Sequence, residues 1–323
     1  MDRREFLKGC AAGAAAGAAA GCNAGLRGCD SQSAVSYALD GKGRLALIVP
    51  GLKESVSVCF ASDTHLALHD DRDDAYAGNY ARMAKWPGDP AAFSKMLSKA
   101  ASDKVDLVAL TGDTISFPTL ANVEFVAGEL EKCGLDWIYT AGNHDWHFEG
   151  DAGSDDEQRA RWIGKRLMPL YRGKVDPLMH SKVVRGVRFV AIDNSTYNIS
   201  EAQLAFWRSE AAKGDPTVLL MHIPLWAEGL DTVFTCGCPK WGAANDPYWE
   251  IERREKWAER QSDETFAFRE DVLSAPNLVA VLTGHEHRHI CACARGKHLL
   301  SIPANRDGYH WRVRIGPAGN MSA

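Results

Sequence analysis

The sequence predicts an α/β fold, because apolar runs of strand length alternate with segments of helical periodicity through its first two thirds. Strands separated by helices of roughly 10–15 residues are typical of βαβ units, in which parallel strands share a sheet. Closely spaced short strands near the carboxyl end indicate antiparallel additions. The chain has 323 residues and no internal repeat, so one large domain or two small ones would fit.

The expected elements follow one another at short intervals. The stretch 90–102 has Phe93, Met96 and Leu97 at helical spacing, and Arg185-Gly186 sits between two apolar runs as a hairpin turn would. The expected helices are 90–102, 120–133, 158–168 and 201–213, and the expected strands are 56–62, 105–110, 137–140, 183–184, 187–192, 217–221, 278–282, 290–294, 298–302 and 311–315.

The composition is that of an ordinary globular protein with an acidic balance. Hydrophobic residues make up 46% of the chain and charged residues 24%, which excludes a disordered chain, collagen and a coiled coil. The formal net charge is −5. An acidic chain lacks the basic field that polyanion binding uses, so we expect no nucleic acid as a partner.

The first residues resemble a twin-arginine export signal. The residues that match its pattern of two arginines, any residue, Phe, Leu and Lys are Arg3, Arg4, Phe6, Leu7 and Lys8. The Ala- and Gly-rich segment that follows is too short and too weakly apolar to span a bilayer, which favours a cleaved signal peptide over residues 1–21. A Gly/Ala linker or a weak helix is the alternative.

The signal indicates where the protein works. We expect the twin-arginine export machinery as a partner and a location outside the cytoplasm, in the periplasm. Ala19-Ala20-Gly21-Cys22 resembles a lipoprotein cleavage box, so a membrane-anchored lipoprotein with a lipid on Cys22 is the second possibility. Residues 22–44, rich in Gly, Ser and Ala, are expected to form a linker before a folded domain over 45–323. The nine cysteines do not reveal their disulfide pairing.

Residues 225–264 differ from the rest of the domain. This stretch holds four tryptophans, a C-x-C pair and several Pro and Gly residues, so it is too aromatic for a disordered linker and too irregular for one element. Long ordered loops are often functional. We expect an aromatic insertion that either packs on the surface or covers the site, where it could stack on a flat group of the substrate.

Five of the predicted strands run directly into Asp, Asn or His. In open α/β sheets the ligand site lies beyond the carboxyl ends of the strands, so five polar blocks at corresponding places indicate one common site. Carboxylate, amide oxygen and imidazole together suit divalent first-row metals. The blocks are Asp63-Thr64-His65, Gly112-Asp113, Gly142-Asn143-His144-Asp145, His222 and Gly284-His285-Glu286-His287.

These blocks resemble the calcineurin-like metallophosphoesterase family, whose pattern is D-x-H, G-D, G-N-H-D/E, a lone His and G-H-x-H. All five occur in order between Asp63 and His287. The resemblance implies a four-layer α/β/β/α sandwich, in which two mixed sheets are flanked by helices and the metal site lies at the carboxyl ends of the strands. Residues 45–323 would then be a metallophosphoesterase domain.

The resemblance also implies a two-metal centre of divalent or trivalent transition-metal ions, namely Mn, Fe or Zn. The implied ligands are Asp63, His65 and His287 for the first metal, Asn143, His222 and His285 for the second, and Asp113 as the bridge. Ser116 stands where the purple acid phosphatase variant has a tyrosine ligand, so we do not expect a tyrosinate–iron site.

The implied function is an exported hydrolase of small phosphate esters, either a phosphomonoesterase or a phosphodiesterase. A hydroxide bridging the metals would attack phosphorus in line, and His144 would assist the leaving group. Asp145 either orients the His144 ring or serves as a helix cap or turn residue. The alternative is a non-catalytic metal-binding surface protein that retained the fold, and the complete ligand set favours the enzyme.

Two further sets of residues remain open. Arg288 and Arg306 are candidate contacts for the phosphate group, although either could be an ordinary surface residue. The run from His69 to Asp74 could bind a metal, but a solvated acidic loop explains it better.

Overall fold

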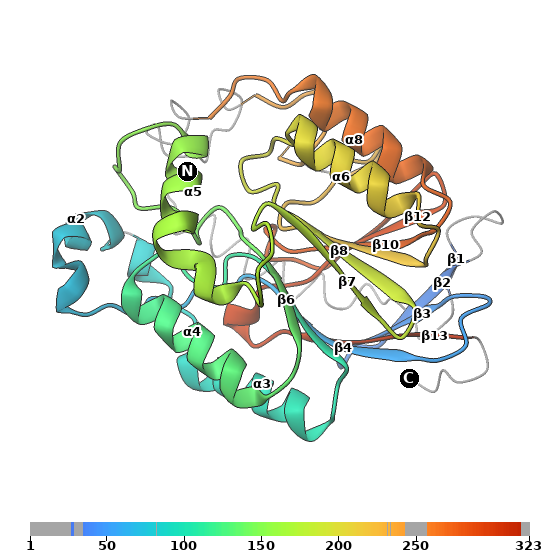
Figure 1. Ribbon diagram of the computed structural model, residues 1–323, viewed down its shortest axis with the longest axis horizontal. Coiled ribbons are helices and arrows are strands. Elements are labelled where there is room, and N and C mark those ends of the chain that lie inside the picture. Colours follow the sequence, from blue (N-terminus) through green and yellow to red (C-terminus); the bar gives the residue numbers. More distant parts are fainter. Residues whose placement is uncertain are drawn as a thin grey trace.

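The computed structural model describes the backbone of residues 27–28 and residues 35–81, 83–230, 232, 234–242 and 257–317. The expected export signal over 1–21 and Cys22 lie outside these residues, as does part of the 225–264 insertion. Figure 1 shows two sheets packed between two outer layers of helices. The four-layer α/β/β/α arrangement expected from the sequence is therefore confirmed.

The first sheet has seven strands in the order β1-β2-β3-β13-β4-β5-β6. The β4, β5 and β6 strands are parallel to one another, whereas β13 is antiparallel to β4. The bounds of the strands are β1 Arg27–Gly28, β2 Ser36–Leu39, β3 Arg44–Ile48, β4 Val56–Ala61, β5 Leu107–Thr111, β6 Trp137–Thr140 and β13 Trp311–Gly316.

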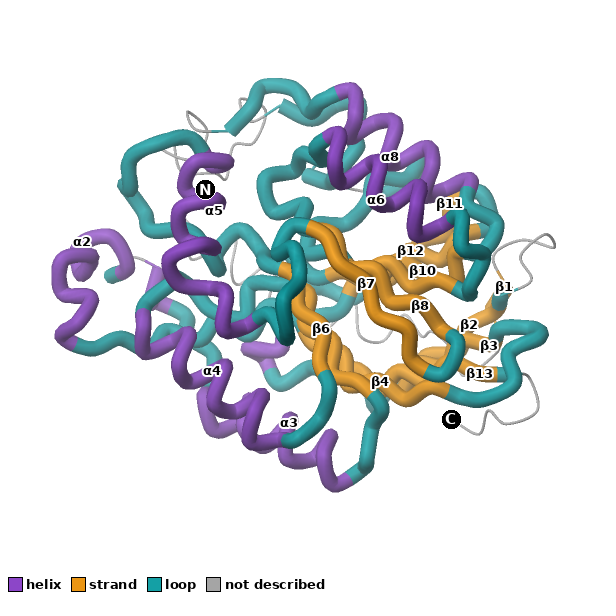
Figure 2. The backbone as a smooth tube through the Cα atoms, in the orientation of Figure 1, coloured by secondary structure: helices purple, strands orange, loops and turns teal. Residues whose placement is uncertain are grey.

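The second sheet has six strands in the order β11-β12-β10-β9-β8-β7. Its four central strands are parallel, and an antiparallel strand closes each edge. The bounds are β7 Met179–Val184, β8 Val187–Ile192, β9 Thr217–Leu220, β10 Leu278–Thr283, β11 Ile290–Ala294 and β12 Lys297–Ser301. Figure 2 shows the strands of both sheets together in the middle of the molecule.

Three apolar cores fill the spaces between the four layers. One lies between the two sheets and joins Phe60 of β4 to Phe189 of β8. A second lies between the first sheet and the helices α3 and α4, and a third lies between the second sheet and α6 and α8. Strands buried on both faces read as continuous apolar runs, as Leu107–Thr111 does.

The helices of the outer layers begin where the sequence supplies caps. In α3 (Pro90–Ser102), the Asp89 side chain accepts a hydrogen bond from the Ala91 amide, and proline occupies the first turn. The α4 helix (Leu120–Cys133) ends at Gly134 in the left-handed conformation. The α6 helix (Glu201–Ala211) begins with a capping box.

Several elements differ from the sequence-based expectation, namely β1, β2, β3, β7, α5 and α8. The β2 strand lies inside the expected linker. Ser36–Leu39 forms a strand because it pairs with β3, and composition does not reveal that pairing. The α8 helix (Asp263–Ser274) was not predicted, since only one narrow face of it is buried. The expected helix 158–168 begins earlier, as α5 (Asp155–Trp162), and continues as a π-helical turn at Ile163–Leu167.

The remaining helical elements are short. They are η1 Asp71–Tyr76, α2 Ala77–Tyr80, η2 Met83–Lys85, η4 Met168–Leu170 and η6 Asn305–Asp307. The run expected to be a solvated acidic loop forms η1, and one of its carboxylates is buried. Asp73 pairs with Arg166 at 3.0 Å and accepts the Leu120 amide at the start of α4. This contact explains one acidic residue of the run without a metal.

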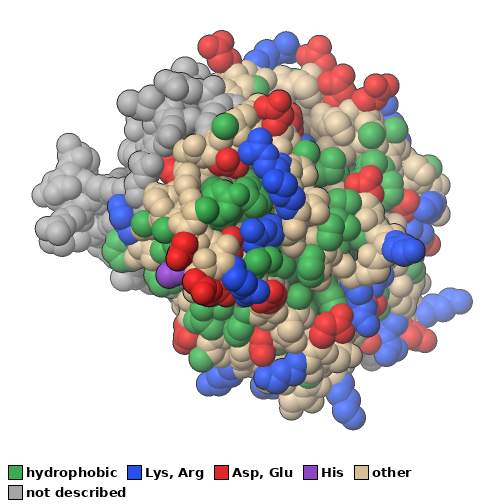
Figure 3. Space-filling view, turned by 60° about the vertical axis from the view of Figure 1, so that its left-hand side comes forward, with side chains coloured by type: hydrophobic (Ala, Val, Ile, Leu, Met, Phe, Trp, Pro, Cys, Tyr) green, Lys and Arg blue, Asp and Glu red, His purple; other side chains and the backbone are tan. Residues whose placement is uncertain are grey.

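Across the described residues, no helix is both long and apolar enough to cross a membrane. On the face in Figure 3, acidic and basic side chains are interspersed around small apolar areas. Among the cysteines, Cys59, Cys236 and Cys238 are buried thiols, whereas Cys293 is disulfide-bonded.

Candidate metal centre

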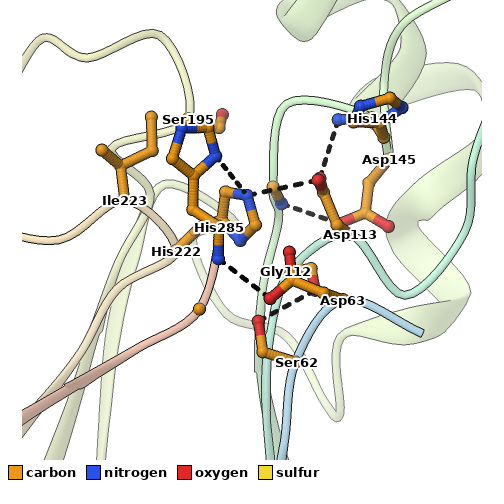
Figure 4. A network of polar contacts seen from close by, with 12 residues as sticks. Ser62, Asp63, Gly112, Asp113, His144, Asp145, Ser195, His222, Ile223 and His285 are labelled. Carbon is orange, nitrogen blue, oxygen red and sulfur yellow. Dashed lines mark hydrogen bonds and ion pairs between the residues drawn. The ribbon is translucent and has the colours of Figure 1, made fainter. Parts of the chain in front are cut away.

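The polar blocks of the sequence meet where strands of both sheets end. Asp63 and His65 follow β4, Asp113 follows β5, and the Asn143 loop follows β6. From the opposite sheet, His222 follows β9, and the loop with His285 and His287 follows β10. Figure 4 shows side chains from the two sheets pointing toward one another.

The backbone is strained at these positions. Five of the expected ligands have a positive φ although none is glycine: Asp63 (57°), His65 (52°), Asp113 (46°), His285 (70°) and His287 (52°). The left-handed region is unfavourable for such residues, and outliers of this kind cluster at functional sites. At roughly 1–3 kcal/mol each, this strain must be offset by packing elsewhere in the fold. The positive φ turns each side chain out of its strand toward the centre.

Glycine is required at two of the loops because their backbones approach a carboxylate. A Cβ on Gly142 would lie 2.3 Å from Asp113 Oδ1, and a Cβ on Gly284 would lie 2.2 Å from Asp63 Oδ2. Real side chains do not tolerate such distances. The glycines of these two motifs therefore let the loops close on the carboxylates.

One group of side chains, which we call the outer cluster, consists of Asp63, His65 and His287. Their ligand atoms lie within 4.8 Å of one another. His287 Nε2 lies 3.2 Å from Asp63 Oδ1 and 3.0 Å from His65 Nε2. The Asp63 and His65 side chains are buried, whereas the His287 side chain is 30% exposed. On its other side, His287 Nδ1 accepts a hydrogen bond from Arg306 at 3.1 Å.

The second group, the inner cluster, consists of Asp113, His222 and His285. His222 Nε2 lies 3.3 Å from Asp113 Oδ2 and 3.2 Å from His285 Nδ1. His222 is fully buried, and its Nδ1 donates to the Thr111 carbonyl at 2.8 Å. Because that bond keeps a proton on Nδ1, it is Nε2 that faces the cluster and would bind a cation once deprotonated.

Two carboxylates connect the clusters. Asp113 Oδ2 lies 3.8 Å from His65 Nε2, so this carboxylate borders both clusters. The His285 amide donates to Asp63 Oδ2 at 2.9 Å, which ties the inner histidine to the outer carboxylate. His144 belongs to neither cluster, although its amide donates to Asp113 Oδ1 at 2.8 Å.

The geometry fits ligands for two cations. Two nitrogens bound at about 2.1 Å and at right angles to each other lie about 3.0 Å apart, which is close to both histidine pairs. Among the described residues, Asp63 Oδ1 and Asn143 Oδ1 are buried without a hydrogen-bond partner. Buried polar atoms are normally satisfied, so these oxygens are suited to a ligand.

The electrostatics leave three of the donors in the state that metal binding needs. Burial opposes ionisation of Asp113, but His222 and His144 hold the pKa of its carboxyl well below the usual range. Burial lowers the pKa of His65, and burial with the nearby His222 lowers that of His285 to about 3. The carboxylate is thus ionised and these two imidazoles are neutral near pH 7. His222 differs, because Asp113 outweighs burial and raises its pKa to about 10.

The structure places Asp145 behind the site. Its Oδ2 accepts the Gly142 amide at 2.7 Å and its Oδ1 accepts the Ile115 amide at 2.9 Å. Both carboxylate oxygens therefore bind backbone, and Asp145 joins the loops after β5 and β6. These contacts fit the turn-residue alternative, and the orienting role toward the His144 ring stays a prediction. Burial and the nearby Asp113 raise the pKa of Asp145 to about 7.

Sequence reasoning missed a sixth loop, which follows β8. Tyr197 places its hydroxyl 2.8 Å from His285 Nε2. Asn194 brackets the backbone of Ile223, accepting its amide at 3.0 Å and donating to its carbonyl at 2.8 Å, and so holds the residue beside His222. The signal was present, because Asp193-Asn194-Ser195 follows a predicted strand as the five recognised blocks do.

The two candidate arginines have different surroundings. Arg306 lies beside the outer cluster, where its amide donates to the Asp63 carbonyl and its guanidinium contacts His287. Arg288 instead pairs with Glu286 at 3.3 Å and is half-exposed. The buried Ser116 donates its hydroxyl to the His65 carbonyl, a contact within the loop structure.

The chain matches a family model described as calcineurin-like phosphoesterase over residues 56–289. No curated protein sequence matches. Among solved structures, a dimetal phosphatase from Danio rerio is 14% identical, with 77% of this chain and 87% of that one covered and a TM-score of 0.48.

Two further solved structures are similar at low identity. A purple acid phosphatase from yellow lupin, Lupinus luteus, is 11% identical, with 86% and 49% coverage and a TM-score of 0.48. A phosphopantetheinyl hydrolase from Mycobacterium tuberculosis is 13% identical, with 83% and 99% coverage and a TM-score of 0.42. The match to the family model spans most of the chain and contains all five polar blocks. The protein therefore belongs to the calcineurin-like phosphoesterase family and is a metal-dependent phosphoester hydrolase.

Proposed function

We propose that this protein hydrolyses small phosphate esters, monoesters or diesters, at two metal ions held by the outer and inner clusters. Family membership implies a dinuclear transition-metal site. The observation that carries the residue assignment is that Asp113 borders both clusters. Asp63, His65 and His287 would hold one ion, Asn143, His222 and His285 the other, and Asp113 would contact both.

The ions, of Mn, Fe or Zn, would neutralise charge on the phosphoryl group and lower the pKa of a nearby water. The chain itself supplies the arrangement around them. The buried carboxylates keep the ligand set anionic, and the left-handed backbone fixes the side-chain directions before substrate arrives. Preorganised groups of this kind need little rearrangement during the reaction.

His144 is the candidate for assisting the leaving group. Its ring lies edge-on to the His65 ring, with the centroids 4.9 Å apart, so it sits on the outer side of the centre. Its amide bond to Asp113 holds the loop in that place. A histidine at this position could donate a proton to the departing oxygen.

Arg306 is the candidate for binding a phosphate oxygen. A neutral imidazole offers one lone pair, so His287 can accept from Arg306 at Nδ1 only while Nε2 carries the proton. If His287 presents Nε2 to a metal, Nδ1 carries the proton and the guanidinium is released toward an anion. Arg306 is partly exposed, which leaves it room to move. Guanidinium groups suit phosphate because they offer paired donors.

The described part of the insertion supports a small substrate over a stacked base. Trp241 and Trp257 are both 7% exposed, so they already lie against other protein groups. Trp226 lies against the Arg269 guanidinium at 4.7 Å. These tryptophans are not placed as open platforms for a nucleobase.

The test is hydrolysis of a chromogenic phosphomonoester and phosphodiester by metal-stripped protein reloaded with Mn, Zn or Fe. We expect turnover to require metal and to reach its maximum at two ions per chain. Nucleotides are assayed in parallel. If protein with two bound ions hydrolyses none of these substrates, the proposal is wrong and a metal-binding role without catalysis becomes the better account.

We also propose that the protein leaves the cytoplasm through the twin-arginine machinery, supported by the Arg3-Arg4 motif and the short apolar segment after it. The mature protein would be periplasmic or anchored through Cys22. Replacing both arginines with lysine should retain the protein in the cytoplasm. Export of the double-lysine variant at the normal rate would contradict this route. The Cys22→Ser variant distinguishes the two locations, because only a lipoprotein would lose its membrane association.

A further inference from the structure

Tyr197 links the inner cluster to the aromatic insertion. Its side chain is fully buried, and its hydroxyl lies 2.8 Å from His285 Nε2. The Tyr197 ring stacks on Trp241 with the centroids 4.2 Å apart and an interplanar angle of 17°. Trp257 packs on the same ring at 4.7 Å. Two tryptophans of the insertion therefore form a wall behind the tyrosine.

The hydrogen bond selects which nitrogen of His285 faces the metal position. His285 Nδ1 points at His222 Nε2, 3.2 Å away, while Nε2 points at the Tyr197 hydroxyl. An imidazole that offers the Nδ1 lone pair to a cation carries its proton on Nε2. The phenol oxygen is then placed to accept that proton's hydrogen bond. Partners of this kind fix the ring orientation of metal-binding histidines.

We propose that Tyr197 is a positioning residue for the inner metal ion alone, and that the insertion serves to hold it in place. The inference rests on the ligand assignment proposed above. Tyr197 contacts the centre through His285 of the inner cluster, whereas His287 of the outer cluster has Arg306 as its neighbour. Loss of the Tyr197 hydroxyl should therefore weaken one ion and leave the other unchanged.

The local backbone indicates that the position of Tyr197 is specific. The residue has a φ of 62°, which is unfavourable for an aromatic side chain. Its amide closes a turn on the Asn194 carbonyl at 2.8 Å, and the Asn194 side chain brackets Ile223 next to His222. One short loop thus supports both inner histidines. Asn194 holds the backbone next to His222, and the Tyr197 hydroxyl contacts His285.

The experiment compares metal binding by the wild-type protein and the Tyr197→Phe variant, which keeps the ring stack and removes only the hydroxyl. Metal-stripped protein is titrated with Co²⁺, and binding is followed by visible absorption and by metal content after dialysis. We expect two ions in both proteins, with one bound about 10–100-fold more weakly in the variant. The control is Tyr171→Phe, a buried tyrosine that packs on Tyr139 in the core between the first sheet and its helices.

A second variant tests whether the tryptophan stacked on Tyr197 contributes. Trp241→Leu keeps the tyrosine and removes the stacked surface, so we expect the same ion to be weakened, by a smaller factor. His222→Ala identifies the inner ion by its spectrum. Thermal unfolding of the metal-free proteins verifies that Tyr197→Phe and the control fold alike.

The outcomes separate this inference from the proposed function. If Tyr197→Phe binds both ions as the wild type does, or loses affinity for both equally, the inference is wrong although the enzyme can still be dinuclear. If the wild-type protein does not bind two ions, the dinuclear assignment fails and the inference fails with it.

Discussion

The outer and inner clusters contain the same kinds of ligand but are supported differently. The inner histidines are held by neutral, buried partners, namely the Thr111 carbonyl for His222 and the Tyr197 hydroxyl for His285. In the outer cluster, His287 is 30% exposed and has a charged guanidinium beside it. Each cluster has one partly exposed histidine, His285 or His287, so the clusters differ in the partner behind that histidine and not in overall burial. The inner one is held by a buried phenol and the outer one by an arginine that can bind an anion.

The difference suggests a division of work between two similar sites. Histidines held by buried hydrogen-bond partners favour tight retention of their ion, because their rings stay in place when the ion leaves. A histidine held by a partly exposed arginine is less firmly placed, so we expect the outer ion to exchange more easily. Four further experiments test the two clusters and their surroundings.

The largest effect is expected from Asp113→Asn, because this carboxylate borders both clusters. Removing its charge should weaken both ions and lower kcat by at least about 10³-fold, equivalent to about 4 kcal/mol of activation free energy. Metal content and turnover are measured together. Asp215→Asn is the control, because Asp215 lies at the amino end of β9, opposite the end that carries His222, and pairs with Arg188. Loss of only one ion would assign Asp113 to a single cluster.

The next effect is expected from His144→Gln, which should lower kcat by about 10²–10⁴-fold while both ions remain bound. The loss should be greater for an alkyl phosphate than for a nitrophenyl phosphate, because a nitrophenolate needs little help to leave. His144 also lies close enough to His65 and Asp113 to be a ligand. If the variant loses an ion, His144 is a metal ligand and belongs to the outer cluster.

A moderate effect is expected from Arg306→Lys. The lysine keeps the charge but not the paired donors, so we expect KM for a phosphomonoester to rise about tenfold with a smaller change in kcat. Metal content should not change. Arg288→Lys is the matched control, since Arg288 pairs with Glu286 instead of the cluster. Equal effects of the two substitutions would show that Arg306 is not a specific contact for the phosphate group.

The smallest effect is expected at Asp155, a buried carboxylate that belongs to neither the outer nor the inner cluster. Burial raises the pKa of Asp155 to about 6, whereas Asp113 has a lowered pKa. Because the folded-state pKa exceeds the ordinary aspartate value of 3.8, the native state loses stability as the pH rises from about 4 to about 6, and the loss persists above that.

The Asp155→Asn variant should therefore unfold with a free energy about 2 kcal/mol higher than the wild type at pH 7.5 and equal to it near pH 3.5. Denaturant unfolding of metal-free protein at both pH values measures this. A difference that does not change between the two pH values would show that Asp155 acts through something other than its charge.

Much of the fold follows from patterns along the chain. The helices 90–102 and 120–133 and the strand 137–140 have the expected bounds, because caps and apolar periodicity mark them locally. The β2 strand could not be predicted, since Ser36–Leu39 becomes a strand only by pairing with β3. The start of α5 was missed although a capping box from Ser154 to Glu157 marks it.

The amino-acid sequence by itself determined which residues converge. A side chain that directly follows a parallel strand must lie at the carboxyl edge of the sheet, so the order of strands and polar blocks already specified one site between Asp63 and His287. The left-handed φ angles and the glycines that approach a carboxylate are the local means of that convergence.

The tertiary structure decided how the converging residues are supported. Which nitrogen of a histidine faces the centre depends on the neighbour behind it, and those neighbours come from other loops: Thr111 for His222, Tyr197 for His285 and Arg306 for His287. The structure likewise shows that Asp145 accepts backbone amides from two loops, which its place in the sequence does not reveal. Hydrogen bonds between loops distant in sequence leave no periodic pattern, so only the folded arrangement reveals them.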